Sequence, residues 1–427
     1  MTPAWAQSSQ NGTVNLQHYL RAVENNSLDL QAQQELVSSA KAGISIAGVR
    51  PDPQFTAGID SKELYGPNKP NTATTTTAGI AITVETANKR QARINAAESN
   101  VRLSEATVSA FKRQLMADAA TSFIEACRSS ASLTRKETSL NALRDIVRMN
   151  ETRLKAGDIG KLEMVQSKVE ADRFAAEVNI ARADTQNALA VLSNFLGKKY
   201  DDAFSGQKIN CDIFQAEKQN SQADPFDDIN KLIQQALEKR EDIQLARSST
   251  ENARDNIELA RANRWIDPVI NLGVKNTPKV NAIQNASGMV TNSPAERSNM
   301  LGLTITVPIP FSRTQSGELT QAQSALTQAS LQLRSVLLKA EIDVRNTYMQ
   351  YQAARQNLSN YKEYVLDDSE RLLQGVRTSY RKGSASMLEL LNAQRNADEI
   401  FLAYLQAEAN AANAKIKLQQ SIAYSAP

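Results

Sequence analysis

The sequence of 427 residues predicts an α+β membrane protein in which one unit, made of two strands and a long helical hairpin, occurs twice. Three observations support this prediction. A glycine turn recurs at an offset close to half the length of the chain, two long tracts contain no proline, and four segments rich in Thr, Ile and Val occupy corresponding places. Self-similarity at a fixed offset indicates an internal duplication.

The two glycine turns lie between long helical tracts. They match at Gly157 and Gly383, at Leu162 and Leu388, and at Glu163 and Glu389. Glycine adopts positive φ without strain, so each glycine is expected to reverse the chain between two antiparallel helices.

The tracts around these turns are predicted to be helices of unusual length. Proline is absent from 71–224 and 311–426, and glycine from 80–156 and 318–374. Because both residues break helices, we expect helices over 15–47, 87–155, 161–195 and 229–263, a long one ending at 382, and a last one ending near 423. Apolar residues recur every seven positions, as a coiled-coil seam requires. The members are Leu133, Leu140, Val147 and Leu154, and then Leu337, Val344, Tyr351, Leu358, Val365 and Leu372. Either an ordinary two-stranded coiled coil or helices with neighbours on two sides would give this pattern.

Four segments are expected to be strands. They cover 51–60, 75–86, 265–274 and 301–307, with polar loops at 63–74 and 275–298. Asp52-Pro53 and Asp267-Pro268 mark corresponding entries. Tilted strands of roughly ten residues fit a bilayer, but four strands cannot close into a barrel unless several chains contribute. The predicted organisation is a leader remnant at 1–6, a first repeat at 7–198, an irregular connector at 199–228 and a second repeat at 229–427.

Composition excludes several function classes. The net charge of +3 gives no electrostatic footprint for nucleic acid, and no apolar stretch approaches the length of a spanning helix. We find no nucleophile motif, phosphate loop or metal-ligand spacing, so neither an enzyme nor a cofactor is predicted. One histidine, His18, and two cysteines cannot make a soft-metal site.

The duplicated order of these motifs resembles the TolC family of outer-membrane efflux proteins, over nearly the whole chain. Ala236-Leu-Glu-Lys-Arg240-Glu241-Asp242-Ile is similar to that family's Ala-Leu-x-x-Arg-Pro-Asp-Leu, with Glu241 in place of proline, and the segment Val307-Pro-Ile-Pro310 fits as well. The stretch from Thr86 to Arg93 resembles the Gly-Lys-Arg stretch of the heavy-metal (CzcC-like) branch, with Asn88 in place of glycine.

This resemblance implies a homotrimer in the outer membrane of a Gram-negative bacterium. Each chain would give four strands to a 12-stranded barrel in the lipid and four long helices to a 12-helix periplasmic tunnel. The chain would be the passive exit duct of a tripartite efflux or type I secretion system. Its partners would be a periplasmic adaptor and an inner-membrane pump of the RND or ABC type. The alternative is a soluble periplasmic coiled-coil scaffold, which would have no use for four barrel-length strands.

The resemblance also assigns residues at the turns. Those expected to dock the adaptor at the tips are Arg153, Leu154, Gly157, Leu162, Arg381, Gly383 and Leu388. Those expected at the gate and pore entrance are Glu163, Tyr380, Glu389 and Asn392. Tyr380 would bond towards Glu163 in the closed state. Glu389 would form a ring of three carboxylates whose crowding raises its pKa and attracts cations; Asn392 replaces a second acidic position. Otherwise these residues are solvated helix ends.

The two cysteines, Cys127 and Cys211, are either unrelated small residues or a bridge between the connector and a long helix, since the periplasm is oxidising. His18 is predicted to be a surface residue. Trp265, Phe55 and Phe311 flank the strands and are either packing residues or part of an interfacial aromatic belt.

Overall fold

The computed structural model describes residues 12–62, 73–211, 226, 228–279, 287–289, 296–309 and 316–424. The predicted first repeat contains β1 (Thr13–Val14), α1 (Leu16–Asn26), α2 (Leu28–Ala47), β2 (Gln54–Lys62), β3 (Ala73–Thr83), α3 (Lys89–Ala156) and α4 (Lys161–Leu196). The connector contains α5 (Tyr200–Phe204) and β4 (Lys208–Ile209). The second repeat contains α6 (Ile229–Lys239), α7 (Glu241–Asn263), β5 (Val269–Thr277), β6 (Ser298–Thr306), α8 (Ser316–Asn360), the π-helical turn η3 (Tyr361–Val365), α9 (Leu366–Arg381) and α10 (Met387–Ser421). The expected leader remnant at 1–6, Phe311 and most of both polar loops lie outside the described residues.

The chain divides into two compact units. A helical unit comprises residues 1–36, 105–245 and 334–427, and a strand unit comprises 37–104 and 246–333. Each unit contains segments from both halves of the sequence, as a duplicated chain would supply.

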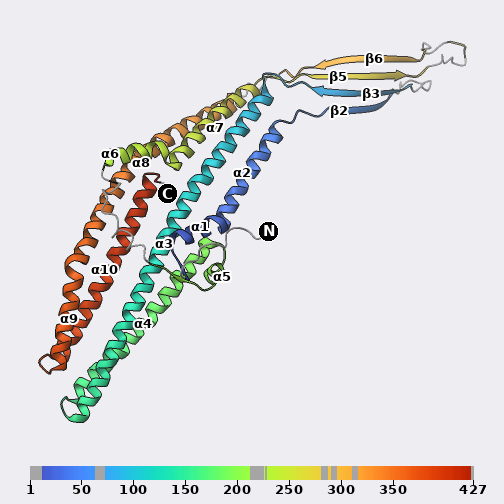
Figure 1. Ribbon diagram of the computed structural model, residues 1–427. Helices are drawn as coiled ribbons and strands as arrows, with labels where there is room; N and C mark the ends of the chain where they lie inside the picture. The colour runs from blue at the N-terminus through green and yellow to red at the C-terminus, as the bar shows by residue number, and fades with distance from the viewer. Residues whose placement is uncertain are drawn as a thin grey trace. The chain divides into compact units, whose positions relative to one another are not determined.

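The sheet of the strand unit is antiparallel in the order β2-β3-β5-β6, and Figure 1 shows its strands side by side. All four strands lie within a few residues of their predicted positions. Where the sheet meets the helices, Lys89 Nζ donates to Asp267 Oδ2 (2.7 Å) and to the carbonyl oxygen of Trp265 (2.5 Å). The backbone N–H of Thr86 donates to Asp267 Oδ1 (2.9 Å), so the aspartate before Pro268 joins the two repeats.

A left-handed turn begins α3 two residues later than predicted. Ala87 and Asn88 have φ of 51° and 54°, which are positive values that asparagine and glycine tolerate best. This explains why Asn88 can occupy the position of the glycine in the Gly-Lys-Arg stretch.

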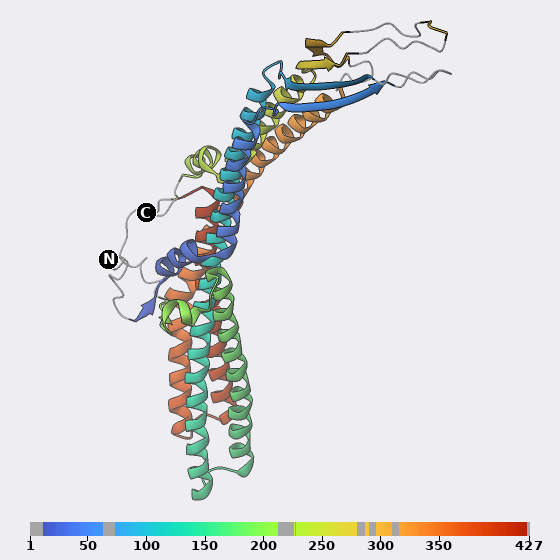
Figure 2. The same cartoon turned by 90° about the vertical axis from the view of Figure 1, so that its right-hand side faces the viewer.

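The helical unit consists mainly of two hairpins. One is α3 with α4, and the other is α9 with α10. Figure 2 shows their helices running side by side. Between them lies an apolar core that includes Leu143, Phe174, Tyr380 and Leu390. A second core, around Tyr19 and Phe123, packs α1, α5 and part of the connector against α3 and α4. The connector is therefore not wholly irregular: α5 covers this core, and β4 pairs in parallel with β1.

Two helices predicted to be continuous are broken. The 15–47 helix breaks at Ser27, whose hydroxyl accepts a long hydrogen bond from the N–H of Leu30 (3.5 Å) and begins α2. The close approach of Gly197 explains the position, because a Cβ there would lie 2.8 Å from the carbonyl oxygen of Asn26. Serine and asparagine favour caps over helix interiors, a signal the sequence does contain.

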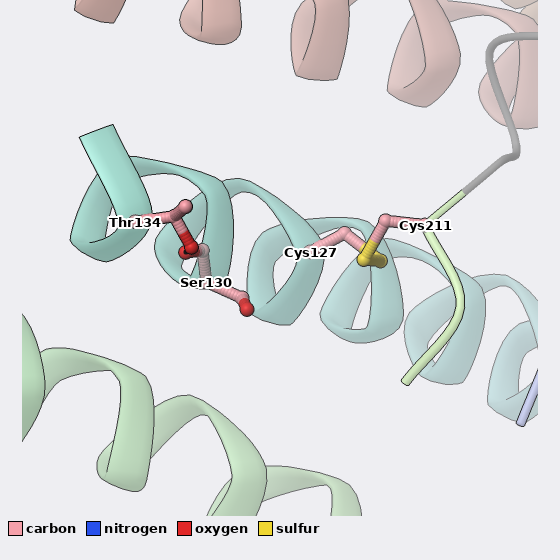
Figure 3. The surroundings of a disulfide bond; sticks show 4 residues. All are labelled: Cys127, Ser130, Thr134 and Cys211. Carbon is pink, nitrogen blue, oxygen red and sulfur yellow. Dashed lines mark hydrogen bonds between the residues drawn. A yellow bond between two sulfur atoms is a disulfide. The ribbon is translucent and has the colours of Figure 1, made fainter. Parts of the chain in front are cut away.

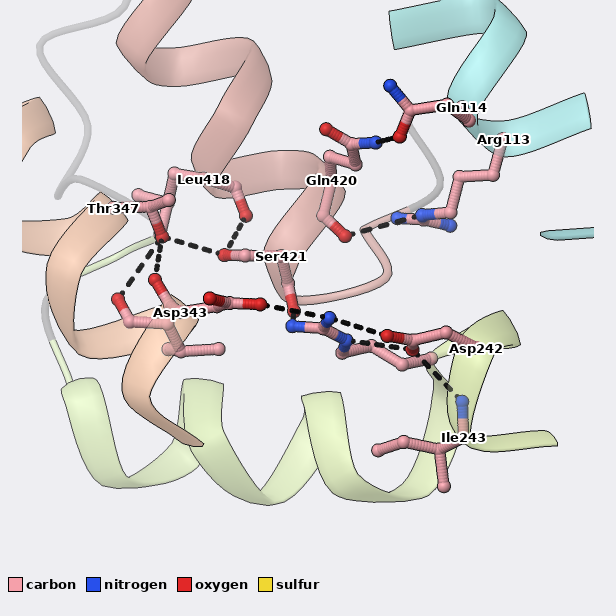
Figure 4. Close-up of polar contacts among 11 residues, drawn as sticks. Arg113, Gln114, Asp242, Ile243, Asp343, Thr347, Leu418, Gln420 and Ser421 are labelled. Atoms are coloured by element: carbon pink, nitrogen blue, oxygen red, sulfur yellow. Dashed lines mark hydrogen bonds and ion pairs between the residues drawn. The ribbon is translucent and has the colours of Figure 1, made fainter. Parts of the chain in front are cut away.

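The 229–263 helix breaks at Arg240, which has φ of −59° and ψ of 132°. The polar contacts of Arg240 stabilise the break without the usual proline, and Figure 4 shows its partners Asp242, Asp343 and Ser421 close to one another. The Arg240 guanidinium donates to both oxygens of Asp242 (3.0 and 2.7 Å), to Asp343 (3.3 Å) and to the carbonyl of Ser421 at the end of α10 (3.4 Å). Burial raises and Arg240 lowers the pKa of Asp242, and the net direction is downward, so the pair is charged at neutral pH.

The predicted seam through α8 and α9 holds only in part. Val344, Tyr351 and Leu358 are buried, but Val365 is 37% and Leu372 is 54% exposed. Leu373 (2% exposed) and Tyr380 (1%) face the core instead. The cause is η3, where the N–H of Leu366 bonds to the carbonyl of Tyr361, five residues back. A π turn holds one residue more than an α turn, so every later position shifts by one.

Candidate functional site

The two hairpin tips have the same backbone structure. In the first, the N–H of Gly157 bonds to Leu154 (3.1 Å) and that of Asp158 to Arg153 (2.9 Å). In the second, Gly383 bonds to Tyr380 (3.0 Å) and Ser384 to Ser379 (2.9 Å). This pair of hydrogen bonds is the Schellman motif, which ends a helix at a left-handed residue. Gly157 and Gly383 have φ of 82° and 76°, so the repeated glycine serves the same turn twice.

The tips expose apolar side chains at equivalent positions. Leu162 is 72% and Leu388 is 68% exposed. Arg381 is also exposed, whereas Arg153 and Leu154 are half-buried. The structure thus brings the residues predicted to dock an adaptor to the ends of the two hairpins, and their docking role remains a prediction.

Tyr380 is the centre of a polar contact between the hairpins. Its ring is buried, and its hydroxyl donates towards Glu163 Oε1 (2.9 Å) and lies 2.8 Å from the amide oxygen of Asn150. The Arg153 guanidinium lies 5.5 Å from the ring centroid. Burial and the bond to Glu163 raise the pKa of Tyr380, so its hydroxyl keeps its proton. Asn150 was not predicted, because a lone asparagine inside a long helix gives no sequence signal.

Two further ion-pair groups connect the hairpins at a greater distance from the tips than Tyr380, and neither was predicted. Arg395 of α10 makes two bonds to Glu170 of α4 (2.9 and 2.6 Å). Arg135 of α3 binds Asp398 of α10 (2.8 Å) and Glu370 of α9 (2.6 Å). The partners in each pair come from opposite halves of the sequence. In the sequence alone, each charged residue therefore cannot be distinguished from a solvated position on a helix.

Glu389 has a local role at the start of α10. Its carboxylate accepts hydrogen bonds from the backbone N–H (2.7 Å) and the hydroxyl (3.0 Å) of Ser386. The backbone N–H of Glu389 donates in return to the Ser386 hydroxyl oxygen (3.2 Å), which completes a capping box. These bonds lower the pKa of Glu389, whereas the expected crowding in a ring would raise it. Glu389 and Asn392 are both exposed.

Cys127 and Cys211 form a disulfide with their Cα atoms 5.4 Å apart. Figure 3 shows the bond joining α3 to the connector just after β4. Cys127 is buried in the core around Tyr19 and Phe123, so the connector is fixed both covalently and by packing.

The sheet has two chemically distinct faces. In the cross-strand register, Phe55, Ile80, Leu272 and Leu303 form one row. Rows two residues away on the same face contain Ala57, Ala78, Val274 and Leu301, and Ile82, Ile270 and Ile305. The opposite face is predominantly Thr and Gly, with Asn271, Lys275 and Met300 among them. The apolar face is uncovered, since Phe55, Leu301 and Leu303 are 74%, 75% and 68% exposed.

Among the described residues, no three His, Cys, Asp or Glu side chains are grouped so as to hold a metal ion. No described helix combines the length and hydropathy needed to cross a membrane. His18 is exposed and contacts the ring of Phe204 edge-on, at 5.3 Å between centroids. Trp265 is 67% exposed beside the sheet.

Comparisons with known proteins agree with this architecture. CzcC of Cupriavidus metallidurans, named a cobalt-zinc-cadmium resistance protein, is 23% identical over 92% of this chain and 86% of its own length. TolC of Escherichia coli, an outer membrane protein, is 22% identical over 56% of this chain and 47% of TolC. The crystal structure of the outer membrane protein VceC from Vibrio cholerae superposes with a TM-score of 0.71 at 18% identity and covers 96% of this chain and 97% of VceC. The sequence profile of the family described as outer membrane efflux protein matches residues 19–198 and 232–423. The chain therefore belongs to the outer membrane efflux protein family, the resemblance that its duplicated motifs predicted.

Proposed function

We propose that this protein is a homotrimeric exit duct of the outer membrane whose periplasmic entrance is gated at the hairpin tips. The uncovered apolar face of the sheet carries this proposal. A soluble scaffold would have to bury such a face, whereas a membrane barrel turns apolar residues outward to lipid and polar residues inward to water.

The glycine positions support a barrel with the polar face inside. Gly79, Gly273 and Gly302 are neighbours across three strands on the polar face. A Cβ at Gly79 would lie 3.0 Å from the carbonyl oxygen of Leu272 and 3.2 Å from the Cα of Gly273, so the backbones come very close on this side. Glycine rows allow a sheet to curve, and the crowded side is the concave one. The outer strands β2 and β6 would pair with those of neighbouring chains, as closure requires.

The helices offer surfaces for the same neighbours. Exposed apolar residues lie seven positions apart on α4, at Leu162 and Val169, and seven or four positions apart on α8, at Leu331, Leu338, Ile342 and Met349. Two different stripes on one chain suit a ring in which each chain contacts the next through unlike surfaces. The strand count of four per chain then gives the expected 12-stranded barrel and 12-helix tunnel. The duct would have no catalytic step, and its adaptor and its RND or ABC pump would supply selection and energy. The two repeats, 7–198 and 229–427, would be the structural halves of each chain.

The contact between Tyr380 and Glu163 would hold the entrance closed. A hydrogen bond to a charged group contributes about 1.5–3 kcal/mol, so losing it should favour the open state about tenfold or more per chain. We expect Tyr380→Phe to raise the open probability in planar bilayers by at least that factor. Tyr348→Phe, which changes a tyrosine on α8, is the matched control and should behave as wild type.

The outcomes separate the proposals. Discrete currents that Tyr380→Phe leaves unchanged would keep the duct and remove Tyr380 from the gate. A protein that gives no current and is extracted without detergent as a dimer would favour the periplasmic scaffold.

The substrate class we propose is divalent metal cations, because the relative CzcC is named for resistance to cobalt, zinc and cadmium. A ring of three Glu389 carboxylates at the entrance would attract such ions. We expect Glu389→Gln to reduce the preference for cations, measured as the reversal potential in a zinc chloride gradient. Ser386→Ala removes only the cap and should leave this potential unchanged. If both variants shift it equally, Glu389 acts through helix capping and not through its charge.

A further inference from the structure

The second hairpin contains one residue more than a regular helix would accommodate. Core positions before η3 are seven residues apart, at Val344, Tyr351 and Leu358. After η3 the heptad resumes at Leu366, Leu373 and Tyr380, so one interval is eight residues long. Without the π turn, α9 would be rotated by about 100° about its axis, the angle of one residue in an α-helix.

The sequence is compatible with both rotations. Val365 lies beside Leu366 and Leu372 beside Leu373, so an uninterrupted helix would place Val365 and Leu372 at the seam. Both side chains are substantially exposed in the present structure. The two registers, with and without the π turn, differ at the tip. In the uninterrupted helix, Ser379 would take the core position that Tyr380 occupies in the present structure. One rotation therefore retains the contact to Glu163 and the other lacks it.

An ion pair fixes the π turn in its present form. Lys362 of η3 lies with its Nζ 3.8 Å from Oε1 of Glu408 on α10, and the Tyr404 hydroxyl donates to the same oxygen (3.0 Å). Glu408 is 9% exposed, and burial raises its pKa while Tyr404 and Lys362 lower it, with a net upward direction. A carboxylate buried to this extent needs its cation, so Glu408 favours the backbone form that presents Lys362.

We propose that η3 is a two-register switch, in which conversion of the π turn to an α turn rotates α9 and withdraws Tyr380 from Glu163 and Asn150. The pair of Lys362 and Glu408 holds the first register. The loop at Gly383, which is exposed and free of side-chain crowding, takes up the rotation. The consequence for opening rests on the proposed gate at the tips, but the switch itself is a property of the helix.

Thiol labelling tests the register directly. The chain has two cysteines and both are in the disulfide, so an introduced thiol is the only one that reacts. In wild type we expect Leu373→Cys to react with a maleimide about tenfold more slowly than Leu372→Cys, because one side is buried and the other exposed. Glu408→Gln, which removes the charge but not the hydrogen-bond acceptor, should bring the two rates within about threefold.

Two controls make the result specific. Glu363→Gln changes an exposed carboxylate in the same π turn and should keep the wild-type ratio. Deletion of Glu363 removes the extra residue and leaves Leu373 and Tyr380 in the seam of a continuous helix, so in a Glu408→Gln background it should restore the tenfold difference. If Leu373→Cys does not assemble, amide exchange across 361–373 reports the same switch and should slow in the deletion variant.

A labelling ratio that Glu408→Gln leaves at the wild-type value would overturn the switch. Labelling needs no channel current, so this failure is distinct from failure of the duct. If Tyr380→Phe changes the open probability but Glu408→Gln leaves the labelling ratio unchanged, the duct is retained and the switch is rejected. If Glu408→Gln changes the labelling ratio but the protein gives no channel currents, the switch is retained and the duct is rejected.

Discussion

Lysine in place of Leu303 should abolish membrane insertion, whereas lysine at the adjacent Thr304 should be tolerated. Leu303 lies on the apolar face in the row of Phe55, Ile80 and Leu272, and Thr304 faces the opposite side with Asn271. A lysine facing lipid near the bilayer midplane costs about 2–4 kcal/mol, and a trimer would carry this cost three times. In the proposed barrel, a lysine facing the water-filled lumen would keep its hydration.

The measurement is the fraction of protein that remains in outer membranes as a trimer after extraction with urea. Wild type and Thr304→Lys should be retained alike, and Leu303→Lys should be lost. Equal retention of both lysine variants would show that Leu303 does not contact lipid. Loss of both would indicate general damage to β6, and Leu303→Ala, a smaller change at the same position, would then serve to test the strand itself.

Removing the disulfide should destabilise the helical unit more than any single side-chain contact described above. Cys127 and Cys211 close a loop with a sequence separation of 84, which contains the C-terminal part of α3 and all of α4. In the chain-entropy description, a loop of this length restricts the unfolded state by about 4–5 kcal/mol. We expect dithiothreitol to lower the midpoint of thermal unfolding of the detergent-extracted protein by about 5–9 °C.

The double variant Cys127→Ala with Cys211→Ala is the control. It should unfold at the temperature of the reduced wild type and should not respond to dithiothreitol. Amide exchange should rise most in α5 and in β4, because the bridge attaches their part of the connector to α3. A wild-type midpoint that stays constant after complete reduction, verified by thiol labelling, would contradict this account.

The sequence permits prediction of most elements but not of their exact register. The strands were predictable because Thr, Ile and Val alternate between Asp-Pro entries and polar loops, a local signal. The tip turns were predictable because a left-handed turn residue favours glycine, which occurs at both Gly157 and Gly383. The pairing of Tyr380 with Glu163 came from a resemblance, and the structure places the two groups in hydrogen-bond contact.

The unpredicted features depend on contacts between distant segments. The break at Ser27 is fixed by the approach of Gly197, and Arg240 is held by groups from three other places in the chain. The prediction that Val365 and Leu372 lie at the seam was wrong, because the adjacent apolar residues Leu366 and Leu373 fit a heptad equally well. Hydrophobic periodicity alone cannot distinguish these two heptads. The register is set by one π turn and by the residues against which α9 packs.

The π turn also bears on the difference in length between the two repeats. Gly79 and Gly302 are equivalent positions in the strands, and Gly157 and Gly383 are equivalent at the tips. The stretch from strand to tip is slightly longer in the second repeat than in the first, which spans it with α3, a helix that is α-helical throughout. Within the longer stretch, η3 accommodates one residue more than an α turn, and apolar cores lie on both sides of it. Relatives that lack this extra residue should align with a one-residue gap between positions 359 and 366, and should have no alternative rotation for the hairpin to adopt.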